Sequence, residues 1–169
     1  EILIKDHQKK ETVLKTDNVV IATGSDAVSL PGIKFDEKVI VSSTGALRLE
    51  QVPKKMVVVG GGYIGLEMGS VWSRLGAEVQ VVEFLDHITP GMDKEISNEF
   101  MKILKKQGIK FNMQNKVEAI QNNKTGAVVS TVDKDGKKNN FDCDVVLISV
   151  GRKANTNGLN LEAVGVELD

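Results

Sequence analysis

Residues 56–67 read MVVVGGGYIGLE. The four apolar residues predict a buried β-strand, and Gly60, Gly62 and Gly65, in the spacing G-x-G-x-x-G, predict a tight turn into a helix. Glu83 closes the next apolar segment, 18 residues beyond Gly65. A glycine motif alone is a weak signal. A strand, three glycines, a helix, a second strand and an acid in this order predict a dinucleotide-binding β-α-β unit.

Each of the three glycines has a separate expected role. Gly60 lets the chain turn off the strand, Gly62 lets the backbone approach a pyrophosphate, and Gly65 lets the helix pack closely on the strand. The first turn of the helix then presents unpaired N–H groups to the phosphates. We expect an apolar stripe to face the sheet and Gly76 to end the helix. The stripe consists of Ile64, Met68, Val71, Trp72 and Leu75.

Glu83 indicates which dinucleotide is bound. A carboxylate at the end of this second strand can accept hydrogen bonds from both hydroxyls of an adenosine ribose, and it repels a 2′-phosphate. Phe84 and Leu85 follow, with no Arg or Lys beside them to receive that phosphate. Taken alone, Glu83 is equally an ordinary solvated acid at a strand end. At this distance from the glycines it favours NAD over NADP.

The composition excludes several classes of function. The 169 residues carry 22 basic and 23 acidic side chains, so the balanced charge does not indicate binding to nucleic acid or to an anionic membrane. No apolar segment approaches the ~18 residues that a membrane span needs. Cys143 is the only cysteine, which excludes a disulfide or a two-cysteine redox centre within the chain, and we expect a packed thiol there. His7 and His87 lack partners at metal-ligand spacing, so we expect no metal site.

Apolar and turn patterns predict an α/β fold. Residues 18–24 predict a buried strand, and the segment that follows the next loop predicts a short helix with Ser43 as its N-cap. After the β-α-β unit, a second helix is expected to start at Asp93 and to end at Gly108. A third strand follows over residues 109–113. This alternation of strands and helices predicts a parallel sheet.

The last third of the chain has a different pattern. Residues 115–141 alternate short apolar runs with turn signals and predict an antiparallel meander. Residues 144–150 then predict a further buried strand. The predicted fold class is therefore α/β, a Rossmann-like parallel sheet with an inserted antiparallel β-meander.

With these segments placed, the chain resembles the nicotinamide-binding domain of the pyridine nucleotide-disulfide oxidoreductase family. The resemblance covers nearly all 169 residues and is closest to members that oxidise dihydrolipoamide. It implies the FAD/NAD(P)-binding domain type of fold. The phrases that carry it are VVIATGS (19–25), VSSTGAL (41–47), GGGYIGLE (60–67), GSVW (69–72), RLGA (74–77), VE (82–83) and VGR (150–152).

The resemblance implies roles for particular residues. The expected NAD contacts are Gly60, Gly61, Gly62, Tyr63, Ile64, Gly65, Leu66, Glu67, Glu83, Val117 and Gly151. The expected FAD contacts are Thr23, Gly24 and Ser25. Glu83 would bind the adenosine ribose, and Tyr63 and Glu67 would lie at the nicotinamide end. The alternatives are a helix-surface aromatic for Tyr63 and a polar residue at the edge of an apolar helix for Glu67. The binding role is favoured for both, because the helix start faces the cofactor.

The family pattern also implies that the chain is part of a longer protein. A flavin-binding glycine run, a redox-active cysteine pair and a C-terminal His-Glu base belong to the family but not to this sequence. We therefore expect no catalytic residue here. The expected domains are the end of a split FAD-binding domain at 1–28, the NAD-binding domain at 29–154 and the return to the FAD domain at 155–169.

The resemblance implies that the longer protein oxidises dihydrolipoamide and passes hydride through FAD to NAD, while the chain alone does not turn over. It implies NAD and FAD as cofactors, lipoyl domains of a 2-oxo acid dehydrogenase complex as partners, and a homodimer, without nucleic acid or membrane partners. It implies the bacterial cytoplasm, with the mitochondrial matrix as the alternative. Two other interpretations remain open: another flavoprotein disulfide reductase or transhydrogenase, and a non-catalytic dinucleotide-sensing module.

Overall fold

The computed structural model describes residues 1–123 and 125–168 of the chain. By its contacts the chain separates into two compact units. The central unit comprises Asp26–Lys153, and the terminal unit comprises Glu1–Ser25 together with the described residues from Ala154 onward. The central unit contains the parallel sheet and the helices that pack on it.

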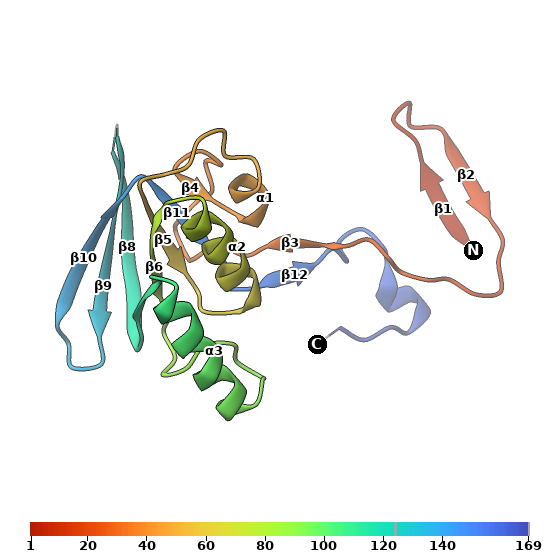
Figure 1. Cartoon of the computed structure of the whole chain (residues 1–169). Helices are drawn as coiled ribbons and strands as arrows, with labels where there is room; N and C mark the ends of the chain where they lie inside the picture. Colours follow the sequence, from red (N-terminus) through yellow and green to blue (C-terminus); the bar gives the residue numbers. More distant parts are fainter. Residues whose placement is uncertain (124, 169) are drawn as a thin grey trace. The chain divides into compact units, whose positions relative to one another are not determined.

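A five-stranded parallel sheet forms the middle of the central unit (Figure 1). Its order is β4 (Ile40–Val41), β11 (Val145–Ile148), β5 (Lys55–Val59), β6 (Glu78–Val82) and β7 (Lys110–Asn112). β11 and β5 are covered on both faces, and apart from Lys55 their sequences are continuous apolar runs. Because all neighbouring strands are parallel, their carboxyl ends lie at one edge of the sheet.

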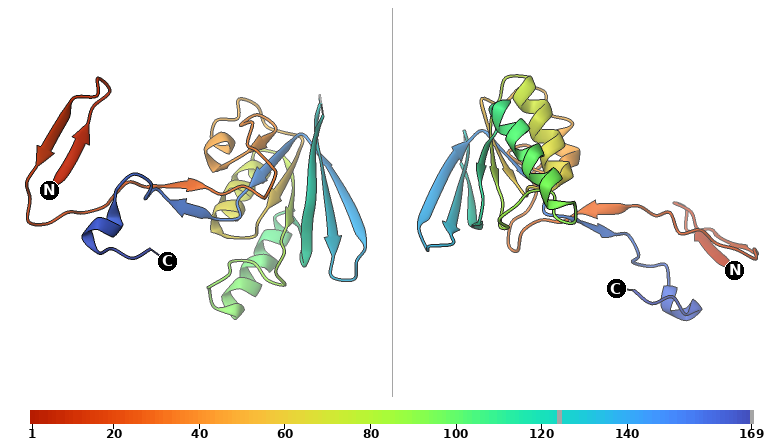
Figure 2. Two further views of the ribbon diagram at one scale, coloured as in Figure 1. Left: turned by 180° about the vertical axis from the view of Figure 1, so that it is seen from behind. Right: turned by 60° about the horizontal axis from the view of Figure 1, so that its bottom comes forward.

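Helices cover one face of this sheet and an antiparallel meander covers the other (Figures 1 and 2). The helices are α1 (Ser43–Ala46), α2 (Tyr63–Arg74) and α3 (Lys94–Lys106). The meander consists of β8 (Asn115–Asn123), β9 (Gly126–Asp133) and β10 (Lys138–Cys143), in the order β10-β9-β8. Val58 of β5 packs in the apolar cluster of Trp72 on the helix side, and Val57 packs in the cluster of Val129 on the meander side.

The terminal unit contains a hairpin and a short helix. β1 (Ile2–Lys5) and β2 (Glu11–Leu14) are antiparallel, and η1 (Leu161–Val164) is a single 3₁₀ turn. β3 (Ser25–Ala27) and β12 (Arg152–Ala154) pair as a two-stranded sheet. The chain passes from one unit to the other within these two strands.

The structure confirms the predicted fold class and most helix limits. Asp93 is the N-cap of α3, and its side chain accepts hydrogen bonds from the backbone N–H groups of Glu95 and Ile96. α2 ends just before Gly76, which has a φ of +112°. The predicted N-cap of α1 is wrong by one residue. Ser42 is the N-cap instead of Ser43, because the Ser42 hydroxyl accepts the hydrogen bond from a backbone N–H group in the first turn.

The predicted apolar stripe of α2 is confirmed only in part: Trp72 is buried and Met68 packs against the same core cluster, but Val71 and Leu75 are exposed. The buried residues of α2 are Gly65, Leu66, Gly69 and Trp72, whereas Val71 and Leu75 expose 45% and 56% of their surface. The cause is the pair of glycines. A Cβ on Gly65 would lie 2.9 Å from Val58 Cγ1, so the backbone of α2 itself approaches β5 along the glycine side. This confirms the close packing that was predicted for Gly65, which the spacing of large apolar residues alone would miss.

The predicted strand over residues 18–24 is also wrong. These residues have no strand conformation and are exposed, and Val20 exposes 89% of its surface. An apolar segment forms a strand where a neighbouring strand satisfies its backbone N–H and C=O groups. No strand in the described part of the chain pairs with these residues.

Candidate dinucleotide site

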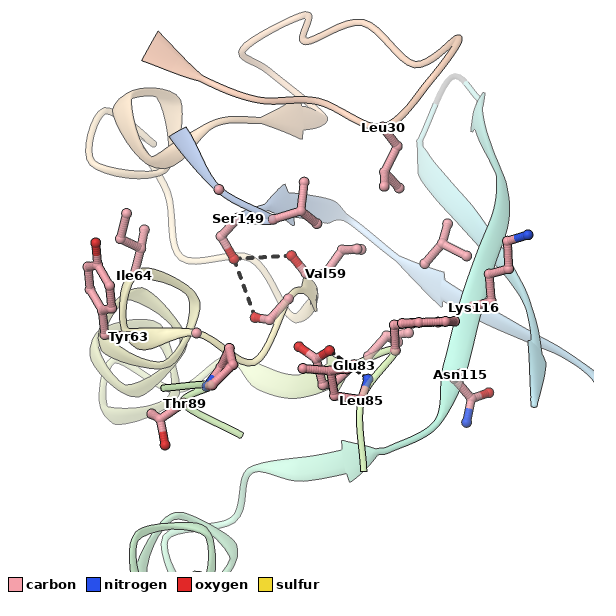
Figure 3. A pocket seen from close by; sticks show the side chains of 18 of the residues that line it. Leu30, Val59, Tyr63, Ile64, Glu83, Leu85, Thr89, Asn115, Lys116 and Ser149 are labelled. Carbon is pink, nitrogen blue, oxygen red and sulfur yellow. Dashed lines mark hydrogen bonds between the residues drawn. The ribbon is translucent and has the colours of Figure 1, made fainter. Parts of the chain in front are cut away.

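A cavity of about 1080 Å³ opens at the carboxyl edge of the parallel sheet. Its wall includes Gly60, Glu83 and Ser149, which directly follow β5, β6 and β11. Val117 of β8 also lines it, and Leu30 of the loop before β4 lines it from another side (Figure 3). Ligands of open α/β sheets bind outside the carboxyl ends of the strands. The topology alone therefore makes this cavity the expected ligand site.

Two glycines of the turn are required by the protein itself. Gly60 has a φ of +106°, and a Cβ there would lie 2.5 Å from the carbonyl oxygen of Ser149. A Cβ on Gly65 would lie 2.4 Å from the carbonyl oxygen of Gly60 and 2.5 Å from Ser149 Oγ. Any side chain at either position would collide with the neighbouring backbone, so both glycines shape the turn.

Gly62 is different, because nothing in the described protein requires it to be glycine. Its φ of −75° and ψ of 174° are open to any residue. No atom lies within 4 Å of the position that a Cβ would take. Gly62 lines the cavity and is the N-cap of α2, where no described side chain caps the helix. The space beside it and the first-turn N–H groups are therefore open to a ligand.

Glu83 is buried at the floor of the cavity, with 8% of its surface exposed. Its Oε2 accepts a hydrogen bond from the N–H of Gly61 at 2.5 Å, and its Oε1 accepts one from the N–H of Leu85 at 2.8 Å. Two backbone donors thus replace the water that a buried carboxylate loses. Each oxygen has a further lone pair, so the carboxylate can also accept hydrogen bonds from a ligand.

Two residues that the sequence analysis did not single out contact the glycine turn. Ser149 Oγ donates a hydrogen bond to the carbonyl oxygen of Val59 at 3.1 Å. The N–H of Thr89 donates one to the carbonyl oxygen of Gly61 at 2.8 Å. In Figure 3, Thr89 and Ser149 lie on opposite sides of the turn. Ser149 could have been found as the first polar residue after a buried strand, whereas no local pattern marks Thr89.

The structure places the predicted NAD contacts in two groups. Gly60, Gly62, Tyr63, Ile64, Glu83, Val117 and Gly151 line the cavity. Gly61, Gly65 and Leu66 are buried outside its lining. Glu67 is exposed on α2, also outside the lining. The predicted FAD contacts Thr23, Gly24 and Ser25 belong to the terminal unit.

Two basic residues from distant segments, Lys116 and Arg152, also line the cavity. Lys116 of β8 contributes to its wall, although the sequence around Glu83 contains no Lys or Arg in its immediate vicinity. In Figure 3 the side chain of Lys116 extends away from Glu83. Glu83 is one of four charged side chains in the cavity wall, together with Lys116, Glu118 and Arg152.

The remaining candidate groups show no reactive arrangement in the described residues. Burial raises the pKa of the Cys143 thiol to about 11, and its Sγ lies 3.5 Å from the carbonyl oxygen of Ala127. This is a packed thiol, as predicted. The described part of the chain contains no group of three or more His, Cys, Asp or Glu side chains arranged to bind a metal ion. None of its helices has the length and apolar character needed to cross a membrane.

Comparison with known sequences supports a single family. The family model for pyridine nucleotide-disulphide oxidoreductases matches residues 1–169. The chain is 52% identical to mitochondrial dihydrolipoyl dehydrogenase of Pisum sativum, over 100% of the chain and 34% of that protein. It is 56% identical to the Caenorhabditis elegans mitochondrial enzyme, over 90% of the chain and 31% of that protein. It is 51% identical to leghemoglobin reductase of Glycine max, over 100% of the chain and 32% of that protein.

Solved structures agree with the fold. LpdA of Mycobacterium tuberculosis superimposes with a TM-score of 0.85 at 25% identity, over 99% of this chain and 36% of that one. The HOCl-induced flavoprotein disulfide reductase RclA of Escherichia coli gives 0.79 at 26% identity, over 99% and 37%. The chain spans about a third of the curated relatives named above. Two of these are named as mitochondrial proteins, so the names do not support the expected bacterial cytoplasm.

Proposed function

The chain belongs to the pyridine nucleotide-disulphide oxidoreductase family, and we propose that its cavity is the NAD site of a dihydrolipoyl dehydrogenase. Relatives with this name share about half of their aligned residues with the chain, as the 52% identity of the pea enzyme illustrates. The observation that carries the site is Gly62. Neither the backbone φ of Gly62 nor the packing around it requires glycine, and Gly62 lies in the cavity wall beside the start of α2, which no described side chain caps.

In the proposed site the pyrophosphate of NAD lies against Gly62. The missing side chain gives the phosphates room, and the first-turn N–H groups of α2 donate hydrogen bonds to them. Gly60 and Gly65 keep the turn in place through their close approach to Ser149 and to each other. The buried Gly61 and Leu66 support the turn from behind.

Glu83 is proposed to bind the adenosine ribose and to select NAD. Its carboxylate lines the cavity while two backbone N–H groups hold it in place. It has free lone pairs for the ribose hydroxyls, and its charge opposes a 2′-phosphate. Lys116 does not compensate this charge, since its side chain extends away from Glu83 (Figure 3).

The nicotinamide end is proposed to lie at the start of α2. Tyr63 lines the cavity and exposes 68% of its surface, and Ile64 lines the cavity beside it. Glu67 follows one helical turn after Tyr63. Val117 and Gly151 complete the proposed contacts from β8 and from the end of β11.

For the longer protein we propose that residues 1–28 and 155–169 belong to an FAD-binding domain and 29–154 to the NAD-binding domain. Thr23, Gly24 and Ser25 would then contact FAD. When bound, FAD would carry electrons from the dithiol of dihydrolipoamide to NAD, which accepts them as hydride. The residues of this chain bind and orient the dinucleotide and contribute no catalytic group.

The partners and location follow from the relatives. We propose that the longer protein serves a 2-oxo acid dehydrogenase complex through lipoyl domains and acts as a homodimer. The mitochondrial names of the pea and Caenorhabditis elegans relatives favour the mitochondrial matrix. The second candidate is another flavoprotein reductase, which the 51% identity to a leghemoglobin reductase supports. Both candidates use the same proposed NAD site.

Calorimetric titration of the full chain with NAD, NADP and ADP-ribose tests the site. We expect NAD and ADP-ribose to bind, and NADP to bind at least about tenfold more weakly because Glu83 opposes its 2′-phosphate. Equal affinity for NADP would contradict the role of Glu83. Binding of none of the three ligands by the folded chain would reject the cavity as a dinucleotide site.

A further inference from the structure

Thr89 has a backbone conformation that is unusual for its residue type. It lies in the connection between β6 and α3 with a φ of +50°. This left-handed region is rare for a β-branched residue, because the branched side chain crowds its own backbone. Thr89 is 4% exposed. A strained conformation in a buried residue persists only where the surrounding contacts determine it, and such residues cluster at functional sites.

The contacts of Thr89 join helix α3 to the glycine turn. Its backbone N–H donates a hydrogen bond to the carbonyl oxygen of Gly61 at 2.8 Å. Its Oγ1 is hydrogen-bonded to Ser97 Oγ in α3 at 2.7 Å. Ser97 is 1% exposed and is absent from the cavity wall. The hydroxyl–hydroxyl bond therefore fixes the side chain of Thr89 while its N–H reaches the turn.

Gly61 is consequently restrained on both of its polar groups. Glu83 Oε2 accepts the hydrogen bond of its N–H at 2.5 Å, and Thr89 binds its carbonyl oxygen. Ile88 packs against the same residue, since a Cβ on Gly61 would lie 3.2 Å from Ile88 Cγ2. With Gly61 restrained in this way, the direction of Gly62 and of the first-turn N–H groups is set before a ligand arrives.

We propose that Thr89, fixed by Ser97, is a positioning residue for the pyrophosphate of the dinucleotide. Thr89 itself also lines the cavity, but the proposed effect is transmitted through Gly61, which is why Ser97 outside the cavity wall is tested as well. This inference rests on the proposed NAD site. Preorganisation of the turn lowers the entropy lost on binding, so the affinity for pyrophosphate ligands depends on the Thr89–Ser97 hydrogen bond. A purely structural role for this bond predicts lower stability without a selective loss of affinity.

Four variants of the full chain separate these roles. Thr89→Val keeps the branched shape but removes the hydroxyl, and Ser97→Ala removes the same hydrogen bond from a residue outside the cavity wall. Thr89→Ser retains the hydroxyl and is the conservative rescue. Ile109→Val shortens a side chain that is 2% exposed at the end of the α3 connection, and serves as a stability control. Each is titrated with NAD, ADP-ribose and adenosine, and its urea midpoint is measured.

We expect Thr89→Val and Ser97→Ala each to raise the dissociation constants of NAD and ADP-ribose by about threefold to tenfold, the range of one buried hydrogen bond. Their double variant should lose no more than either single variant, because both remove one bond. Thr89→Ser and Ile109→Val should stay within about twofold of wild type. Adenosine, which lacks the pyrophosphate, should bind all variants alike.

Three outcomes overturn the inference: unchanged NAD affinity in folded Ser97→Ala, an equal loss for adenosine, or an equal loss of affinity in Ile109→Val. Should Thr89→Val fail to fold, Ser97→Ala still decides. A wild-type chain that binds neither NAD nor ADP-ribose rejects the proposed function. A wild-type chain that binds both, with variants that bind equally well, rejects only the positioning role of Thr89.

Discussion

Replacing Gly62 with alanine should weaken NAD binding while leaving the chain folded. Alanine adopts a φ of −75° without strain, and its methyl group would meet no protein atom within 4 Å. The loss of glycine at the N-cap costs a few tenths to about 1 kcal/mol, and the reduced freedom of the unfolded chain returns about 0.4–1 kcal/mol. The free energy of unfolding should therefore stay within about 1 kcal/mol of wild type.

The same substitution at Gly65 should act mainly on stability. Its Cβ would lie 2.4 Å from the carbonyl oxygen of Gly60, well inside the contact distance. Relief of this overlap requires α2 to move away from β5, and overpacking of this kind costs about 1–3 kcal/mol. Gly65→Ala is thus the contrast to Gly62→Ala, although the two glycines belong to one motif.

Two measurements on each variant distinguish the glycines. Trp72 is the only tryptophan and is 8% exposed on the helix side of the core, so its fluorescence during urea unfolding reports the central unit. Calorimetry gives the dissociation constant of NAD. For Gly62→Ala we expect a urea midpoint close to wild type and a dissociation constant raised at least about tenfold, because the added methyl occupies the space proposed for the pyrophosphate.

Gly69→Ala is the matched control for affinity. Gly69 lies on the same helix outside the cavity wall, and its Cβ would lie 3.3 Å from Val79 Cγ1. The NAD affinity of this variant should equal that of wild type. The reasoning is refuted if folded Gly62→Ala binds NAD within about twofold of wild type, since the open space at Gly62 would then have no ligand to explain it.

Three further predictions concern charged and titrating groups. Glu83→Gln places an amide NH₂ against one of the two backbone N–H donors, so urea unfolding should show a loss of about 1–3 kcal/mol, and calorimetry a narrower preference for NAD over NADP. Burial raises the pKa of Cys143 from 9.0 to about 11, so the stability contributed by the neutral thiol is present below pH 9 and is lost as the pH rises through about 11. Cys143→Ala should lack this part of the alkaline loss in urea unfolding. Burial acts to raise the pKa of Asp36, but backbone N–H groups of Lys38, Ile40 and Val39 lower it overall; the resulting stability is present above pH 3.8 and lost as the pH falls through the lowered pKa. An unchanged acid unfolding curve in Asp36→Asn would contradict that contribution.

Local patterns in the sequence were enough to predict β5, β6, β7 and β11 of the sheet, the meander and the turn, but not the edge strand β4. β11 and most of β5 are continuous apolar runs, and Asp93 and Gly76 mark helix limits through local hydrogen bonding and a positive φ. The buried face of α2 was predicted only in part, since the close packing of Gly65 and the burial of Trp72 were expected but the exposure of Val71 and Leu75 was not. It depends on how closely Gly65 and Gly69 approach β5 and β6, which is a tertiary contact that apolar periodicity does not include.

In the site, too, some residues can be predicted from a local motif and others reach the cavity only through the fold. Gly60, Gly62 and Glu83 follow from a motif within 28 residues of sequence, from 56 to 83. Ser149 and Lys116 reach the cavity from segments far along the chain, and only the pairing of strands brings them there. The strand prediction for residues 18–24 fails because their local apolar pattern is that of a strand, but no strand in the described part of the chain pairs with them.

The position of Glu83 can be explained by the sheet rather than by its spacing from the glycines. β5 and β6 are adjacent and parallel, with Val59 opposite Val82. The next residue on each strand is therefore Gly60 on one side and Glu83 on the other, and the N–H of Gly60 donates a hydrogen bond to the carbonyl oxygen of Val82 at 2.9 Å. This register brings the carboxylate to the turn, where it binds the N–H of Gly61. The length of α2 and of the loop from α2 to β6 matters only because it allows β5 and β6 to pair with Val59 opposite Val82. The acid is thus part of the glycine turn in the free protein, and the same contact that stabilises the turn leaves its remaining lone pairs at the cavity for a ribose.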